Sequence, residues 1–172
     1  MAVQTVEIHA RQNQVRLPIL WRLSRLFNVI PHLRRARVTE DFGYMLLDLE
    51  GATPEVGQAA QYLRAMGLMG GQSEPVPVAA PEDEMDRASS IALRLTAVGA
   101  QQARAPVLHR VGKDFNVVYV IDRAAFDDEE GGWLEITLSG PLIDVQRAIA
   151  YLHTTGLQVF PFQRSVTDFK NL

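Results

Sequence analysis

Charged side chains recur at matched positions in two halves of this 172-residue chain, and they are the residues best suited to binding a ligand. Arg16 and Arg104 each precede a proline by two positions, and Arg35 and Arg123 also share a position. Backbone amides at the start of a helix donate hydrogen bonds to a bound carboxylate, and a guanidinium adds a bidentate donor. The spacing therefore predicts a site for the carboxylate of an amino acid beside a helix N-terminus.

Two interpretations stay open for these residues. The arginines either bind a ligand or form ordinary structural pairs with Glu40, Asp48 or Asp122, since exposed charges commonly pair on protein surfaces. Tyr44 and Trp133, which share a strand position, either wall an apolar pocket between the halves or fill the seam. The candidate ligand-binding residues are Arg16, Arg104, Arg35, Arg123, Tyr44 and Trp133.

No pattern of residues predicts catalysis. The four histidines do not recur between the halves and have no second ligand at metal spacing. A Gly-x-Ser-x-Gly nucleophile motif is absent from the sequence. The carboxylates from Asp127 to Glu130 fall in a turn, where water would equalise their environments. We therefore expect a protein that is not an enzyme, with no catalytic residue, no metal site and no cofactor.

The charge and composition of the chain exclude some classes of partner. The net charge is −3, and the cluster of Arg34, Arg35 and Arg37 lacks the aromatic pattern of an RNA-binding sheet. The apolar runs are too short for a membrane span, and the N-terminus lacks the pattern of a secretory signal. The chain has no cysteine and therefore no disulfide framework. We expect a cytoplasmic protein that does not bind nucleic acid or insert into a membrane.

The matched positions belong to a duplication that covers most of the chain. A repeat this long is one structural unit copied, and each copy of about 75 residues is near the lower limit for an independent core. We therefore expect the copies to pack on each other or to dimerise. Arg16, Pro18, Leu20, Arg22, Phe27, Asn28 and Val29 recur 88 positions later, and Gly43, Leu49, Gly51, Val56, Ala59, Tyr62, Leu63, Gly67 and Leu68 recur 89 positions later.

Within each copy the hydrophobic period alternates between that of strands and that of helices. Val6, Ile8 and Ala10 alternate with polar residues as in a half-buried strand, and Pro18 starts a helical pattern that Asn28 should end. Two strands, a second helix and a short strand near Leu68 follow. The order strand, helix, strand, strand, helix, strand predicts an α+β protein with two tandem ferredoxin-like βαββαβ domains, antiparallel sheets and helices on one face.

The predicted domain boundaries follow from the repeat. The first copy spans residues 1–71 and the second spans residues 89–162. The prolines and acidic residues of the segment 72–88 predict a solvated linker, of which Val76 to Val78 could finish a strand. Residues 163–172 form a C-terminal tail.

Both copies resemble the NIL domain, a ferredoxin-like module of bacterial methionine importers. The resemblance rests on Arg104 to Leu108, on Phe115-Asn116-Val117 and on the stretches Ala148 to Leu152 and Gly156 to Val159. The triplet that names the family is replaced, because its positions hold His32-Leu33-Arg34 and Val120-Ile121-Asp122. The importer's ATPase is missing, since no phosphate-binding loop occurs.

The resemblance implies a regulatory role. NIL domains of importers pair and bind methionine as a feedback signal, and ACT domains pair in a similar way to bind amino acids. Our hypothesis is a non-catalytic ligand-sensing module for methionine or another amino acid, held between the two domains. The alternative is a protein-interaction scaffold that forms a homodimer or recruits another protein. The sensing hypothesis expects two halves that meet across a shared boundary, and a single undivided core, or halves with unlike topology, would overturn it.

Overall fold

The computed structural model describes residues 1–70, 76–99 and 106–161. The first repeat consists of two helices and three strands, and the second repeat has the same order with one more strand. A short 3-10 helix, η1, lies between them. The elements are β1 (Ala2–Ala10), α1 (Ile19–Leu26), β2 (Val29–Val38), β3 (Gly43–Gly51), α2 (Thr53–Ala65), η1 (Pro81–Glu84), β4 (Ser89–Val98), α4 (Val107–Asp114), β5 (Val118–Asp127), β6 (Gly131–Gly140), α5 (Leu142–His153) and β7 (Gln158–Pro161).

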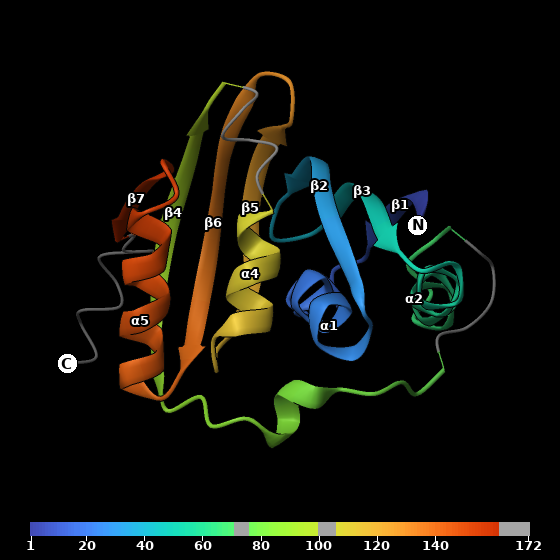
Figure 1. Cartoon of the computed structure of the whole chain (residues 1–172), viewed down its shortest axis with the longest axis horizontal. Coiled ribbons are helices and arrows are strands. Elements are labelled where there is room, and N and C mark those ends of the chain that lie inside the picture. Colours follow the sequence, from blue (N-terminus) through green and yellow to red (C-terminus); the bar gives the residue numbers. More distant parts are fainter. Residues whose placement is uncertain (71–75, 100–105, 162–172) are drawn as a thin grey trace.

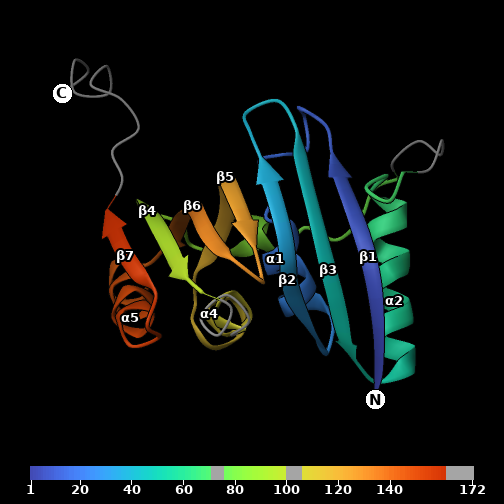
Figure 2. The same ribbon diagram turned by 90° about the horizontal axis from the view of Figure 1, so that it is seen from above.

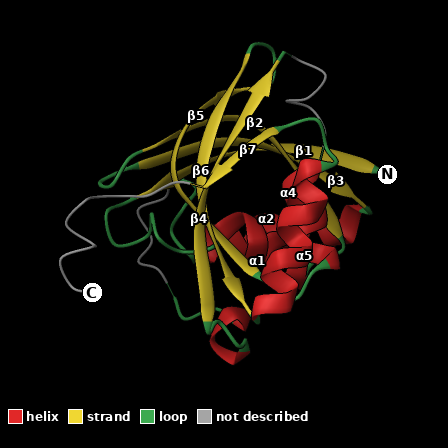
Figure 3. Cartoon of the chain, turned by 90° about the vertical axis from the view of Figure 1, so that its left-hand side faces the viewer, coloured by secondary structure: helices red, strands yellow, loops and turns green. Residues whose placement is uncertain are grey.

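The strands of both repeats join in one antiparallel sheet. Its order is β1-β3-β2-β5-β6-β4-β7, so each repeat has the strand order of a ferredoxin-like sheet (Figure 1). The repeats meet edge to edge, where Arg35–Val38 of β2 pair with Ala124–Asp127 of β5. Figure 2 shows the strands in a row, and Figure 3 shows the helices gathered on one side. The predicted α+β class and tandem ferredoxin-like architecture are confirmed.

Local signals in the sequence explain most element ends. Pro18 and Pro106 precede α1 and α4, where their fixed φ suits a helix start. Asn28 does not end α1 in a left-handed conformation, contrary to the expectation from the sequence. The helix stops at Leu26, and Phe27 is already extended with a φ of −128°. The tight connection to β2 thus leaves no room for a left-handed residue.

The duplication extends to an irregularity in the sheet. In β2 the register with β3 shifts between Leu33 and Arg35, and in β5 the register with β6 shifts between Ile121 and Arg123. Each repeat therefore carries a β-bulge at the same position. A bulge bends its strand and increases its twist, so β2 and β5 are each bent close to the segment in which they pair.

The first repeat lacks a counterpart of β7. The main-chain N–H of His9 donates to the carbonyl of Leu68 at 2.8 Å, but the chain then turns away at Gly70, whose φ is +77°. The short strand expected near Leu68 is therefore wrong, and residues 76–78 are not a strand either. No strand among the described residues pairs with the outer edge of β1.

The buried apolar residues of both repeats form one continuous cluster. Its centre is the pair α1 and α4, which pack against each other in a reciprocal way. A Cβ on Gly112 would lie 3.2 Å from Trp21, while the His109 ring lies 3.0 Å from the Ser24 hydroxyl. Trp21 and His109 occupy matched positions, as do Ser24 and Gly112, so the interface has the self-complementarity of a two-fold dimer. The apolar cluster therefore continues across the boundary where the two repeats meet, which disfavours sensing by a hinge between them.

The segment between the repeats is tied to the first one. Glu82 of η1 is 5% exposed, although the sequence predicts a solvated acidic linker. Its carboxylate accepts hydrogen bonds from Nε of Arg22 at 3.0 Å and a further bond from Nη2. Burial alone lowers the pKa of Arg22, but the bonds to Glu82 outweigh it and raise that pKa above its ordinary value.

Among the described helices, none is long and apolar enough to cross a membrane.

Candidate functional site: a groove and a hollow between the repeats

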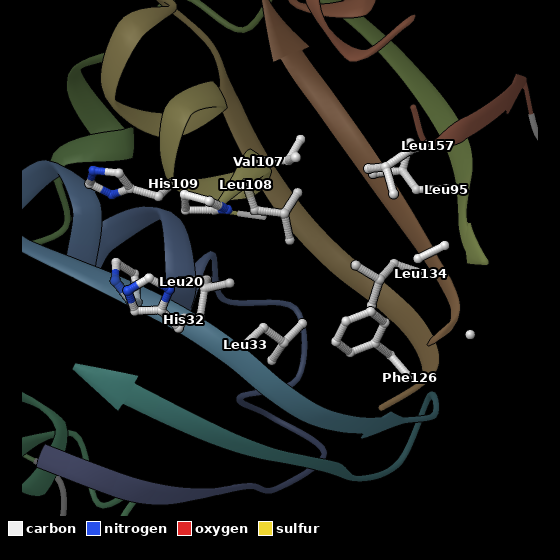
Figure 4. A pocket seen from close by; sticks show the side chains of 14 residues that line it. Leu20, His32, Leu33, Leu95, Val107, Leu108, His109, Phe126, Leu134 and Leu157 are labelled. Carbon is white, nitrogen blue, oxygen red and sulfur yellow. The ribbon is translucent and has the colours of Figure 1, made fainter. Parts of the chain in front are cut away.

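An apolar groove lies between the repeats, beneath α4 and above the sheet. Its volume is about 50 Å³, and its described lining holds no polar side chain except two imidazoles (Figure 4). The first repeat contributes Leu20, Pro31, His32 and Leu33, and the second contributes Val107, Leu108 and His109 from α4. Phe126 and Leu134 are among the sheet residues that form its floor.

The groove exists because β2 and β5 pair only in part. β5 ends at Asp127, opposite Arg35, so the outer edge of β2 near Leu33 has no strand beside it in the described structure. The helix α4 lies over this gap. The groove is therefore a direct product of the way in which the two copies join.

The matched cavity in the first half is nearly filled. It lies between α1, the first sheet and residues Tyr119 and Ile121 of β5, which match Pro31 and Leu33. Val15 and Leu17, from the segment before α1, occupy it and leave about 20 Å³. Among the described residues, the groove of the second half is therefore the roomier of two matched cavities, and Ala103 and Ala105, which match Val15 and Leu17, lie outside the described residues.

The two histidines of the groove have different surroundings. Nε2 of His32 lies 2.9 Å from a carboxylate oxygen of Glu50. Nδ1 of His109 lies 3.0 Å from the hydroxyl oxygen of Ser24, and burial together with the nearby charge of Lys113 lowers the pKa of His109. His109 therefore favours its neutral form, and both rings are held at one nitrogen.

A second cavity, which we call the charged hollow, brings together two of the predicted ligand residues. Arg16 from the first repeat and Arg123 from the second both line it. Its other charged lining residues are Glu40, Asp122 and Glu135, and its volume is about 100 Å³. The hydroxyl of Thr137 donates to Asp122 at 2.6 Å.

The other predicted residues line neither cavity in the described structure. Arg35 lies 3.5 Å from Asp127, and Arg104 lies outside the described residues. Tyr44 donates to Glu7 at 3.4 Å. Trp133 is covered by Arg94, whose guanidinium carbon is 4.5 Å from the ring centre.

Tyr44 and Trp133 nevertheless flank the seam on the face without helices. Arg37 pairs with Tyr44 on one side and with Ala125 on the other, and Ala125 pairs with Trp133. Tyr44 and Trp133 therefore lie in the same row across the sheet, with Arg37 of β2 and Ala125 of β5 between them. Asp48, one of the partners weighed for the candidate arginines, lies 3.8 Å from Arg34, which is not one of the candidates.

Several lining residues escaped the sequence analysis because they are not duplicated. His32 and His109 match Val120 and Trp21, so the search for repeated polar residues passed over them. Glu135 matches Leu46 and was missed for the same reason. The one available signal was that His32 and Leu33 occupy the positions of the family triplet. No group of three metal-ligating side chains occurs among the described residues.

The fold and its cavities define a class of protein. It is a tandem ferredoxin-like protein in which paired repeats enclose cavities at their junction. The family model of the NIL domain matches residues 4–69 and 92–160, which together make up more than half of the chain. The chain therefore belongs to the NIL domain family and contains two copies of the domain. The family is that of a regulatory domain of methionine importer ATPases.

Comparisons with curated proteins and solved structures do not extend this family assignment. No curated protein matches the chain significantly. One similar solved structure is described as a microcompartment protein from Desulfitobacterium hafniense DCB, with 13% identity and a TM-score of 0.37. The match covers 99% of this chain and 98% of that one. At this TM-score the likeness supports no argument about fold or function.

Proposed function

We propose that the protein is a non-catalytic ligand-sensing module that holds an amino acid with an apolar side chain in the groove between its repeats. The observation that carries this proposal is the groove itself, which both repeats line and which, within the described structure, is roomier than its counterpart beside Val15 and Leu17. Methionine is the first candidate because the family regulates methionine importers.

The groove suits the two parts of such a ligand. Its apolar lining would bury a side chain, and burial contributes about 25 cal/mol per Å² of apolar surface. The polar part of the ligand needs hydrogen bonds, and the free nitrogens of His32 and His109 could provide them. The outer edge of β2 near Leu33 also presents backbone groups that no described strand pairs.

Because the core is continuous across the two repeats, a bound ligand would act on their junction. A ligand in the groove would contact α1, β2 and α4 together, so it would tighten the junction without moving whole repeats. Anything that binds only the folded state stabilises it in proportion to the logarithm of ligand concentration. The signal would then be the position and order of α4.

Calorimetry and thermal unfolding with methionine, leucine, phenylalanine and glycine test the proposal. We expect methionine to bind and to raise the melting temperature, and glycine to have no effect at the groove. Leu33→Gln should weaken methionine binding by about tenfold or more, because it puts a polar group in the apolar lining. Ile30→Gln, on the same strand but outside the lining, is the matched control. No heat with any apolar amino acid and folded protein would reject the proposal.

A second candidate function is a protein-interaction scaffold, which the outer edge of β1 favours because no described strand pairs with it. The strand is regular over Ala2–Ala10, and Val3 is 62% exposed. An extended segment of another chain adds readily to such an edge. Affinity capture should then yield a specific partner whose binding is lost in Val3→Lys and unaffected by amino acids.

A further inference from the structure

We propose that the charged hollow is a second binding site, specific for a small zwitterion such as glycine or alanine. The hollow is distinct from the groove. Ala92 and Glu135 lie on the face of the sheet without helices, because their strand neighbours Leu93 and Leu134 point into the core. The inference does not rest on the function proposed for the groove.

The strongest indication is Glu135, a buried carboxylate without a partner. Glu135 is 6% exposed, and within the described structure it forms no hydrogen bond and no ion pair. It stands between Arg94 and Arg123 in the row across the sheet. Arg94 stacks on the ring of Trp133 and forms no ion pair with Glu135 in the described structure. A carboxylate with so little contact with water and no bonded partner, at the wall of a cavity, is suited to bind a cationic group that a ligand supplies.

The opposite charge is present in the same cavity. Arg16 and Arg123 come from different repeats and line the hollow together with Glu135. Guanidinium groups bind carboxylates through paired hydrogen bonds, and a carboxylate such as Glu135 binds an ammonium group. A molecule that carries both groups fits this arrangement better than a simple anion or a simple cation, each of which would meet like charge.

The remaining lining limits the ligand's size. Only Val15 and Ala92 are apolar, which leaves room for a short side chain and none of the apolar surface that a long one needs. Glu40 and Asp122 add negative charge, which disfavours phosphate. The side chains here do not form a cluster that could hold a metal ion, as far as the described residues show.

Titration of the full chain by NMR, with glycine, alanine, acetate and ethylamine as probes, tests the inference. We expect glycine or alanine to shift the amide signals of Glu135 and Arg123, and acetate or ethylamine to bind much more weakly. Glu135→Gln and Arg123→Gln should each weaken binding by about tenfold or more, because each removes a charge-assisted hydrogen bond. Arg147→Gln, an exposed arginine on α5, is the matched control and should have no effect.

The outcomes are separable from those of the groove. Leu33→Gln should leave glycine binding at the hollow intact, and Glu135→Gln should leave methionine binding at the groove intact. Absence of any shift with either zwitterion, equal binding of acetate, or full binding in Glu135→Gln would each overturn the inference.

Discussion

The indole N–H of Trp21 donates a 2.6 Å hydrogen bond to the main-chain carbonyl of Val117, which links α1 of the first repeat to the start of β5 in the second. The same ring packs over Gly112 of α4, and the matched His109 lies against Ser24. The junction is thus built from one large and one small residue on each helix. Each pair of matched positions has kept this size relationship.

Replacing Trp21 with Phe should destabilise the protein by about 2 kcal/mol, because it removes a buried hydrogen bond and leaves a small cavity. Urea unfolding of the full chain measures the change. Trp133→Phe is the control, since that ring lies on the opposite face of the sheet and contacts Arg94. We expect it to cost no more than about 1 kcal/mol. Equal losses for the two variants would show that Trp21 has no special role at the junction.

The two helical glycines predict opposite effects of substitution by alanine. A Cβ added to Gly57 of α2 would have no atom within 4 Å, so Gly57→Ala should stabilise the protein by up to about 1 kcal/mol through helix propensity. At Gly112 the new methyl would lie 3.2 Å from Trp21 and 3.4 Å from Tyr119, which are both fully buried. Gly112→Ala should therefore lower the stability by about 1 kcal/mol or more. Thermal unfolding of the pair checks the sign, and a stabilised Gly112→Ala would contradict the tight junction.

Loss of one member of the buried Arg22–Glu82 pair should be severe. Glu82→Gln leaves the guanidinium of Arg22 buried without its counterion, and such changes cost about 3–5 kcal/mol. The double variant Arg22→Met with Glu82→Leu should recover most of this loss, because it removes both charges. Chemical denaturation of the single and double variants gives the coupling energy. Additive effects would show that the two side chains do not act as a pair.

A buried hydroxyl without a partner predicts a stabilising substitution. Burial raises the pKa of Tyr119, and no hydrogen-bond partner for its hydroxyl lies in the described part of the chain. Tyr119→Phe should therefore raise the stability by about 1 kcal/mol. Tyr62 is the matched control, since its hydroxyl donates to the carbonyl of Ala79 and Tyr62→Phe should destabilise. Melting temperatures that fall equally in both would contradict this account.

Protonation of His109 should destabilise the folded protein in mild acid. Its pKa is lowered from the ordinary value of 6.5 in the folded protein, so the unfolded chain binds a proton more readily. Stability is complete above pH 6.5 and falls as the pH drops toward the lowered folded pKa. Unfolding measured between about pH 7.5 and about pH 5 should show this decline. His109→Gln should flatten the decline more than His153→Gln, which alters an exposed ring on α5.

The alternation of buried residues was sufficient to predict the fold of each repeat. Positions such as Val6, Ile8 and Ala10 specify which face of a strand is buried, and this depends on local sequence alone. The missing strand after Leu68 could not be predicted in this way. Leu68 matches Leu157, but among the described residues only the second segment continues as a strand at the edge of the sheet.

The cavities were harder to predict because they arise from the junction. Arg16 and Arg123 could be singled out as repeated arginines. Only the pairing of β2 with β5, which joins the two repeats, brings them together. His32, His109 and Glu135 break the repeat, so a search for matched residues could not find them. Glu82 escaped for a different reason, since its sequence context is that of a solvated segment and its burial depends on Arg22.

The bare edge of β1 also sets a limit on assembly. The opposite edge of the sheet ends in β7, which has only four residues and offers little to a further strand. If two chains joined through β1, the antiparallel pairing would place a two-fold axis between them. Both outer ends of the merged sheet would then be the short strand, so growth would stop at two chains and no fibre would form.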